Sequence, residues 1–218
     1  MPVVVRGITC GYGRTVAVDD VSLDVAPGEL IAITGSNGSG KSTLLKAILS
    51  LIPLRAGTIE VNGQEATDIV GRRRRWQQVT KVRQRPATGQ FPILVDELLE
   101  SSGDHEAALD AAAALGVADL RHRPLGALSG GQLQRSEIAR AIGAISAGAG
   151  VLLADEPTAS LDFDGKHQIA EILTALPVTV LAVTHDAALA NRCDRVADMA
   201  LGKLRVVSPV VSSPGRGA

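Results

Sequence analysis

One glycine-rich loop constrains the fold of this chain more than any other feature. The loop, GSNGSGKST, spans residues 35–43 and has the spacing G-x-x-x-x-G-K-[ST]. It follows LIAIT (residues 30–34), an apolar run that predicts a strand buried on both faces. It leads into KSTLLKAILSLI (residues 41–52), whose apolar residues have helical spacing. A buried strand, a tight turn and a helix in this order predict an α/β fold with a phosphate-binding site at the turn.

The residue types of the loop indicate how it would bind phosphate. Glycines let the backbone wrap closely around phosphate oxygens, and amide N–H groups at the start of a helix face the anion. Lys41 can reach the β and γ phosphates of a nucleotide, and the Ser42 hydroxyl can ligate Mg²⁺. The expected nucleotide-binding residues of the loop are Gly35, Ser36, Asn37, Gly38, Ser39, Gly40, Lys41, Ser42 and Thr43.

A second apolar run, VLLADEP (residues 151–157), predicts another buried strand with two carboxylates at its end. Ligand sites in open α/β sheets lie at the carboxyl ends of strands. Asp155 is suited to the Mg²⁺ coordination shell, and Glu156 is the candidate to orient or polarise an attacking water. Beside the phosphate loop, this pair predicts nucleotide hydrolysis.

A third motif, LSGGQLQR (residues 128–135), predicts a capped helix. Ser129 is a good N-cap, two glycines expose backbone N–H groups, and the apolar spacing continues as a helix. Its start is a second place where an anion could bind. The residues alone are equally consistent with an ordinary, well-capped helix.

Composition and charge limit the class of protein. The 218 residues are 45% apolar but only 2% aromatic, which suits an α/β core of Val, Leu, Ile and Ala. The net charge of −1 gives no global basic field for nucleic acid, and the run Arg72–Arg75 is interpreted as a solvated face near a loop. The two cysteines lack metal-ligand spacing, and a reduced cytosolic setting fits. We expect no signal peptide and no spanning segment.

The pattern along the chain predicts one domain over residues 1–207. Strands and turns dominate residues 1–89 and 146–207, and an Ala- and Leu-rich helical part lies at about 90–145. In that part, Asp104 is the expected N-cap of a helix and Gly116 its C-terminal stop. Residues 208–218, rich in Ser, Pro and Gly, are expected to be a disordered tail.

Taken together, the motifs resemble the ATP-binding cassette (ABC) family over almost the whole chain. The ordered set is Tyr12, the phosphate loop, Gln84, the signature LSGGQ, LLADEP, SLD at residues 160–162 and THD around His185. The resemblance implies a P-loop ATPase core with a mainly parallel sheet, an N-terminal antiparallel β subdomain and an inserted α-helical subdomain. It also implies a head-to-tail dimer with two ATP molecules in its interface.

The family roles carry over residue by residue as expectations. Tyr12 stacks on adenine, Gln84 contacts Mg²⁺ and the attacking water, and Asp162 couples the subunits. His185 holds the γ-phosphate and supports Glu156. The resemblance thus implies three groups: a catalytic set (Lys41, Gln84, Glu156, His185), Mg²⁺ ligands (Ser42, Gln84, Asp155), and a signature that caps the other subunit's ATP (Ser129, Gly130, Gly131, Gln132). The other histidines, at 105, 122 and 167, have no role.

The chain departs from the family pattern in places. Arg83 stands before Gln84 where related proteins often have Pro or an aromatic residue, and KV (residues 81–82) replaces a frequent YV. RHRPLGA (residues 121–127) replaces an acidic segment typical of exporters, which argues against an exporter-type cassette.

The resemblance also implies partners. FPILVDEL (residues 91–98) resembles a segment of cassettes that drive uptake of metals and metal chelates, so we expect import of zinc or manganese ahead of iron chelates. We expect a homodimer or pairing with a second cassette, separate transmembrane permease subunits, an extracytoplasmic substrate-binding protein, and a cytoplasmic place on the inner face of the membrane. Pro86, Gly89 and Pro92 are expected to form a hinge.

Two alternatives stay open. One is a soluble, non-transport ABC protein that acts in assembly, repair or regulation. Repair types carry a coiled-coil insertion, and this chain has no heptad run there. The other is a P-loop kinase for a small molecule, in which the signature and Gln84 would have no purpose.

Overall fold

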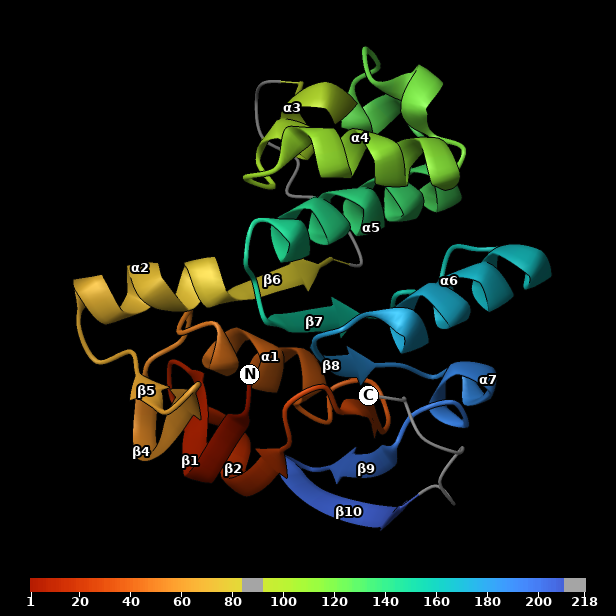
Figure 1. Cartoon of the computed structure of the whole chain (residues 1–218). Coiled ribbons are helices and arrows are strands. Elements are labelled where there is room, and N and C mark those ends of the chain that lie inside the picture. Colours follow the sequence, from red (N-terminus) through yellow and green to blue (C-terminus); the bar gives the residue numbers. More distant parts are fainter. Residues whose placement is uncertain (84–91, 210–218) are drawn as a thin grey trace.

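The structure, a computed structural model, describes residues 1–83 and 92–209 (Figure 1). Its first sheet has the strand order β2-β1-β4-β5, and all its neighbouring strands are antiparallel. The four strands are β1 (Val3–Tyr12), β2 (Thr15–Val25), β4 (Leu54–Val61) and β5 (Gln64–Glu65). This sheet is the antiparallel β part that the sequence predicted at the N-terminus.

The second sheet has the order β10-β9-β3-β8-β7-β6. Its neighbours from β9 to β6 are parallel, and only the edge strand β10 is antiparallel to β9. The strands are β3 (Leu30–Thr34), β6 (Val79–Val82), β7 (Val151–Asp155), β8 (Thr179–Val183), β9 (Arg195–Ala200) and β10 (Lys203–Pro209). The three central strands are apolar almost throughout because helices or the first sheet cover both of their faces.

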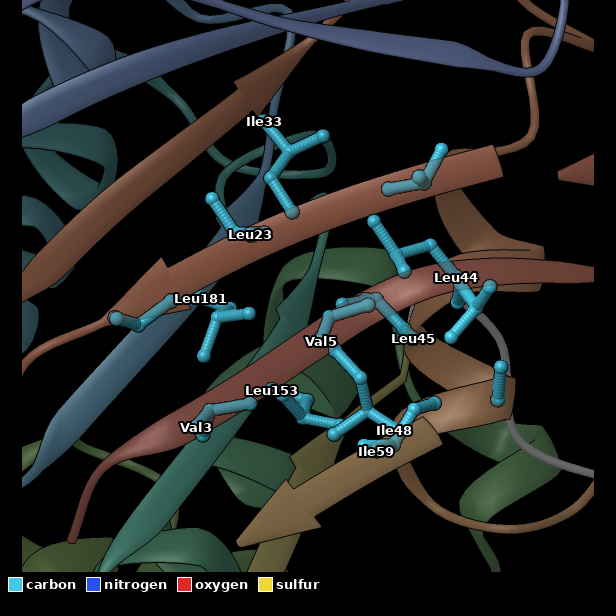
Figure 2. Close-up of a cluster of buried hydrophobic side chains, with 14 of the residues drawn as sticks. Val3, Val5, Leu23, Ile33, Leu44, Leu45, Ile48, Ile59, Leu153 and Leu181 are labelled. Atoms are coloured by element: carbon cyan, nitrogen blue, oxygen red, sulfur yellow. The ribbon is translucent and has the colours of Figure 1, made fainter. Parts of the chain in front are cut away.

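Alternate residues of these central strands enter two separate hydrophobic clusters. Ile33, Leu153 and Leu181 face β1, β2, β4 and helix α1 (Lys41–Ile48), as Figure 2 shows. Ala32, Leu152 and Val180 face the other way, toward helices α3 to α7. Because side chains alternate along a strand, each apolar run supplies both clusters. The parallel sheet therefore lies between the antiparallel sheet with α1 on one face and most of the helices on the other.

The helices of the second cluster lie mainly between β6 and β7 in chain order. They are α3 (Val95–Glu100), α4 (His105–Ala114), two 3₁₀ turns (Ala118–Leu120 and Leu125–Ala127) and α5 (Gly130–Ser146); α6 (Phe163–Ala175) and α7 (Ala187–Ala190) follow β7 and β8. In Figure 1, α3 and α4 stack on the far side of α5 from the sheet. Asp104 caps α4 by accepting from the Ala107 N–H, and Gly116 follows the helix with a φ of 68°, both as predicted.

The Arg72–Arg75 run is the solvated face that the sequence suggested in three of its four residues, and Arg75 is the exception. The run lies in helix α2 (Ile69–Gln78), and although Arg72, Arg73 and Arg74 are exposed, Arg75 is buried. The Arg75 guanidinium donates to the carbonyl oxygens of three residues, at 2.8 Å (Ile48), 3.1 Å (Ile59) and 2.8 Å (Gln64). It therefore joins the end of α1 to β4 and β5. Charge composition could not show this, because the burial depends on which helix face meets the sheet.

Helix α1 is shorter than predicted. It ends at Ile48 rather than Ile52, because Ser50 takes the left-handed conformation with a φ of 56°. The Leu51 N–H then donates to the Lys46 carbonyl oxygen at 2.9 Å, which closes the helix.

Two predicted features fall partly or wholly outside the described residues. Gln84, Pro86 and Gly89 lie in the undescribed stretch 84–91. Of the predicted tail, residues 208 and 209 continue β10 and 210–218 are not described. Over the ranges 1–83 and 92–209, none of the helices has the length and apolarity that crossing a membrane requires.

Candidate functional site

The phosphate loop lines a cavity of about 630 Å³ at the carboxyl ends of the parallel strands. The cavity is also lined by Asp155, the last residue of β7, by Glu156 directly after it, and by His185 after β8. Residues from three distant parts of the sequence therefore meet at one edge of the sheet. That is where ligands bind in open α/β folds.

Two glycines of the loop are required by close backbone packing. A Cβ on Gly40 (φ 109°) would lie 2.3 Å from the Ala17 carbonyl oxygen. One on Gly35 (φ 131°) would lie 2.0 Å from the Met199 carbonyl oxygen. Gly38 also has a positive φ, of 80°, but nothing lies within 4 Å of its Cβ position. The loop is thus held against β2 and β9 at two points and is open at a third.

The polar groups of the loop fit a phosphate anion. The Lys41 ammonium donates to the carbonyl oxygens of Gly35 at 2.6 Å and Ser36 at 2.9 Å, so it already lies across the loop. The Ser39 hydroxyl is buried and has no hydrogen-bond partner among the described residues. A phosphate oxygen would satisfy such a group, because a buried hydroxyl without a partner is unfavourable.

Two of the three residues predicted as Mg²⁺ ligands, Ser42 and Asp155, also lie together. The Ser42 hydroxyl donates to Oδ1 of Asp155 at 3.2 Å. A hydroxyl and a carboxylate are the oxygen donors that Mg²⁺ prefers, and it usually takes only one or two carboxylates. These two residues therefore fit the ion. Gln84, the third predicted ligand, lies outside the described residues.

Glu156 and His185 form a pair beside the loop. Nε2 of His185 lies 3.3 Å from Oε1 of Glu156, and the backbone N–H of His185 donates to Oε2, also at 3.3 Å. Glu156 has a φ of 54°, a conformation that is unusual for a residue other than glycine. Its backbone N–H donates to the Val183 carbonyl oxygen at 2.9 Å, which holds this turn in place. Unusual backbone at such a position is common at active sites.

Lys81 is a charged neighbour of this site that the sequence analysis did not identify. Its ammonium lies 3.6 Å from Oδ2 of Asp155, and both side chains are largely buried, at 16% and 11% exposure. Burial lowers the pKa of Lys81, although the Asp155 charge opposes this shift. Only the departure KV in place of YV could have drawn attention to it.

The signature residues do not line this cavity. Ser129 caps α5 as predicted, since its hydroxyl accepts from the Gln132 N–H at 3.2 Å and Gln132 Oε1 accepts from the Ser129 N–H at 3.0 Å. The signature glycines pack on the turn before α6, where a Cβ on Gly130 would lie 2.9 Å from that of Ser160. Among the described residues that line the phosphate cavity, none belongs to 129–132.

Two further predicted residues have local contacts. Asp162 caps α6 by accepting from the Gly165 N–H at 3.0 Å, and its Oδ1 lies 3.9 Å from a guanidinium nitrogen of Arg135. Tyr12, at the end of β1, is half exposed, and its hydroxyl accepts from the Lys46 ammonium at 3.1 Å. The structure does not bring either side chain into the phosphate cavity within the described residues that line it.

The cavity also contains residues that the motifs did not indicate. They include a second cation, Lys166 of α6, and four small residues without a motif of their own: Ala17, Thr158, Ala159 and Ala187. The one sequence signal that could have placed Lys166 near the site is its position in the first turn of the helix that Asp162 caps. The small residues carry no sequence signal of their own.

The fold and this cavity define a P-loop ATPase. A phosphate loop follows the buried strand β3. Asp155 at the end of β7 contacts Ser42 of α1, and Glu156 directly after β7 contacts His185, which follows the neighbouring strand β8.

Comparison with known proteins identifies the family. Residues 18–159 match the family model described as "ABC transporter". A hemin import ATP-binding protein, HmuV of Rhodopseudomonas palustris (strain BisA53), is 36% identical over 92% of this chain and 80% of its own length. A phosphonates import ATP-binding protein, PhnC of Maricaulis maris (strain MCS10), is 37% identical over 90% and 83%. This chain therefore belongs to the ABC transporter family, and it is an ATP-binding cassette ATPase.

Other relatives differ in architecture or share mainly the fold. A macrolide export ATP-binding/permease protein, MacB of Bradyrhizobium diazoefficiens (strain JCM 10833 / BCRC 13528 / IAM 13628 / NBRC 14792 / USDA 110), is 36% identical over 89% of this chain but only 31% of its own length. The dimeric cassette MJ0796 bound to ADP and Pi superposes with a TM-score of 0.85 over 97% of this chain and all of that one, at 24% identity.

Proposed function

We propose that this chain hydrolyses ATP to drive import through separate membrane-spanning permease subunits. The observation that carries the proposal is the meeting of the phosphate loop, Asp155, Glu156 and His185 in one cavity. Family membership supports ATP as the nucleotide, and the hemin and phosphonate relatives support import.

We assign the phosphate contacts to the loop, residues 35–43. Its N–H groups and the start of α1 face the β and γ phosphates, and Lys41 neutralises their charge. Gly35 and Gly40 set the loop's path, and the Ser39 hydroxyl is available to a phosphate oxygen. Tyr12 is assigned to the adenine ring, because it is a half-exposed aromatic side chain at the end of β1 and its hydroxyl accepts from Lys46 of α1, the helix that follows the loop.

Ser42 and Asp155 would hold Mg²⁺, with Gln84 as the third protein ligand in this proposal. There the ion would supply positive charge to neutralise the negative charge that develops on the phosphate oxygens. Glu156 orients and polarises the attacking water, a role that phosphoryl transfer requires because positioning and electrostatics supply most of its catalysis. His185 keeps the Glu156 carboxylate in place through its ring and its backbone N–H, and its ring is half exposed toward the cavity.

The active unit in this proposal is a dimer, of two copies or of this chain with a second cassette. The signature residues Ser129 to Gln132 lie on a helix start outside the chain's own phosphate cavity. A helix start with exposed N–H groups is an anion site, and a partner's γ-phosphate would fill it. Asp162 caps α6 and lies close to Arg135 of the signature helix α5, where it can couple the two subunits. The dimeric cassette with a similar fold supports this arrangement.

A second, larger cavity supports the permease proposal. It measures about 1540 Å³ and lies between the helical part and the sheet. Apolar side chains line it, among them Leu49, Leu51, Trp76, Ile93 and Leu98. We assign it to a short cytoplasmic segment of a permease. Its contact with Asp155 gives that segment a route to the ATP site. The chain would then be cytoplasmic and peripheral on the inner face of the membrane.

We propose a metal chelate as the imported cargo, delivered by an extracytoplasmic binding protein. The expectation of free zinc or manganese finds no support among the relatives reported above, whereas the hemin relative falls in the chelate group. The 36% identity to a hemin ATPase and 37% to a phosphonate ATPase show that cassette similarity alone separates these cargoes poorly.

The test begins with Glu156→Gln. This variant is expected to bind ATP, to lose hydrolysis by at least about a hundredfold, and to accumulate as a dimer. Glu171→Gln, at an exposed glutamate of α6, is the matched control and is expected to bind and hydrolyse ATP like the wild-type chain. A Glu156→Gln protein that stays monomeric with ATP and turns it over normally would contradict the role of Glu156.

Co-purification from native membranes tests the transporter part. A polytopic membrane protein is expected with the wild-type chain. Recovery of soluble partners alone would favour the alternative of a non-transport ABC ATPase. With the permease and its binding protein in proteoliposomes, a metal chelate should stimulate ATP hydrolysis, and zinc or manganese ions should not.

A further inference from the structure

We propose that Lys81 is a positioning residue that competes with Mg²⁺ for Asp155, and that it thereby weakens divalent-cation binding at the ATP site. The inference rests on the proposed function, since it takes Asp155 as a Mg²⁺ ligand. It goes beyond that function because it assigns the strength of cation binding to a residue outside the known motifs.

Lys81 and Ser42 hold Asp155 from opposite sides. The Ser42 hydroxyl donates to Oδ1 at 3.2 Å, while the Lys81 ammonium lies 3.6 Å from Oδ2. Ser42 lines the phosphate cavity and Lys81 lines the larger cavity, and Asp155 lines both. Asp155 therefore borders both cavities, with a residue of the phosphate cavity at one carboxylate oxygen and a residue of the larger cavity at the other.

Strand register explains this contact. In the parallel pair of β6 and β7, Lys81 is paired with Leu153, and Val82 with Ala154. Side chains alternate along a strand, so Lys81, Leu153 and Asp155 point to the same face of the sheet. Asp155 is the diagonal neighbour of Lys81, at a separation that a long side chain can span. Arg140 of α5 donates to the Lys81 carbonyl oxygen and fixes the backbone there.

The environment makes this pair electrostatically important. Both side chains are largely buried, and charges interact more strongly there than in water. Lys46 adds further positive charge around Lys81. A divalent cation that binds Asp155 must therefore share the carboxylate with an ammonium and approach it against like charge. An aromatic residue at this position would offer neither competition nor repulsion.

The pair could also be structural, holding β6 to β7 with no effect on the ATP site. The two interpretations predict opposite effects of replacing Lys81 on the affinity for the divalent cation. A purely structural Lys81 would, when replaced, loosen Asp155 and leave cation binding equal or weaker. A competing Lys81 would, when replaced, make cation binding stronger. Ser42 continues to hold the other carboxylate oxygen in that variant, so Asp155 keeps one of its anchors.

The experiment measures Mn²⁺ binding by electron paramagnetic resonance with a non-hydrolysable ATP analogue, so that no turnover is needed. Lys81→Met is expected to lower the dissociation constant for Mn²⁺ on the order of tenfold. Lys81→Arg, which keeps the charge, should stay near wild type. Arg83→Met removes an exposed positive charge from the same cavity and should change binding by less than about twofold, because exposed charges are screened.

Unchanged or weaker Mn²⁺ binding by Lys81→Met would overturn the inference. Thermal unfolding checks that the variant folds, and Lys81→Gln, which keeps a hydrogen-bond donor, takes its place if it does not. Wild-type protein that binds neither the nucleotide nor Mn²⁺ with it would instead contradict the proposed function. The two failures are therefore distinct.

Discussion

Nε2 of His185 lies 3.3 Å from Oε1 of Glu156, and the His185 N–H donates to the other oxygen of the same carboxylate. The two residues follow different strands, β8 and β7, which are neighbours in the parallel sheet. The glutamate is nearly buried, at 12% exposure, whereas the imidazole is half exposed at 49%. The carboxylate is therefore held from one side and free to face the cavity on the other.

His185→Ala should reduce hydrolysis more than binding. Loss of the imidazole frees the Glu156 carboxylate, so we expect ATP turnover to fall by about a hundredfold while nucleotide affinity changes little. Phosphate release and fluorescence of a labelled ATP analogue measure the two effects. His122→Ala, at an exposed histidine without a role, is the control. In a Glu156→Gln background the substitution should add little, because the two residues act as a unit; additive losses would show that His185 acts elsewhere.

Gly40→Ala should destabilise the chain more than Gly38→Ala. Both glycines have positive φ, so each alanine costs about 1–2 kcal/mol in backbone strain. Only at Gly40 does the added Cβ also meet backbone, at 2.3 Å from the Ala17 carbonyl oxygen. Urea unfolding of the nucleotide-free proteins should show at least about 2 kcal/mol between them. Equal losses would mean that β2 moves away from the loop freely.

Arg75→Met should lower the free energy of unfolding by roughly 3 kcal/mol or more, because three hydrogen bonds from a charged group are lost. Arg73→Met, on the exposed side of the same helix, should change it by less than about 0.5 kcal/mol. Methionine retains a good helix propensity, so the helix itself is not the cause. If denaturant titrations gave similar free energies of unfolding for the two variants, the buried contacts of Arg75 would contribute no more to stability than an exposed arginine.

Ser146→Ala should destabilise the protein at neutral pH and less so in acid. The Ser146 hydroxyl donates to Asp104 at 2.6 Å and, together with the Ala107 N–H, lowers the pKa of that carboxyl. A depressed pKa in the folded state contributes stability above the unfolded pKa of about 4, and this contribution is lost as pH falls through the folded value. The difference in stability between the wild-type protein and Ser146→Ala, called the stability gap below, should therefore narrow below about pH 4.

Thermal unfolding over a pH series measures this gap. Asp104→Asn keeps a good N-cap but cannot ionise, so in that background the effect of Ser146→Ala should be the same at every pH. A gap that persists unchanged at acid pH in the wild-type background would mean that the hydroxyl acts through geometry rather than through the charge.

Local patterns determined much of this protein. The sequence predicted three features because each depends on neighbours in sequence. They are the strand, loop and helix around residues 30–52, the carboxylates after residues 151–154, and the capped helix after Ser129. Continuous apolar runs predicted the three central parallel strands β3, β7 and β8 but not β6, whose short run Lys81 interrupts. The strands β9 and β10 and the helix α2 were not identified, because polar residues interrupt their apolar patterns; β9 also pairs with β3, which lies far away in the chain.

Only the tertiary structure decided the rest. Arg75 is buried while its three neighbours are exposed, because one face of α2 meets β4 and β5. Lys81 reaches Asp155, because the register of β6 against β7 sets it diagonally opposite. The family resemblance implied that His185 supports Glu156, and the structure gives the reason: the two strands that precede these residues are separate in sequence but neighbours in the sheet. Sequence motifs specify which groups a chain carries, but which groups come within reach of one another depends on strand order and register, and these are set by packing over the whole fold.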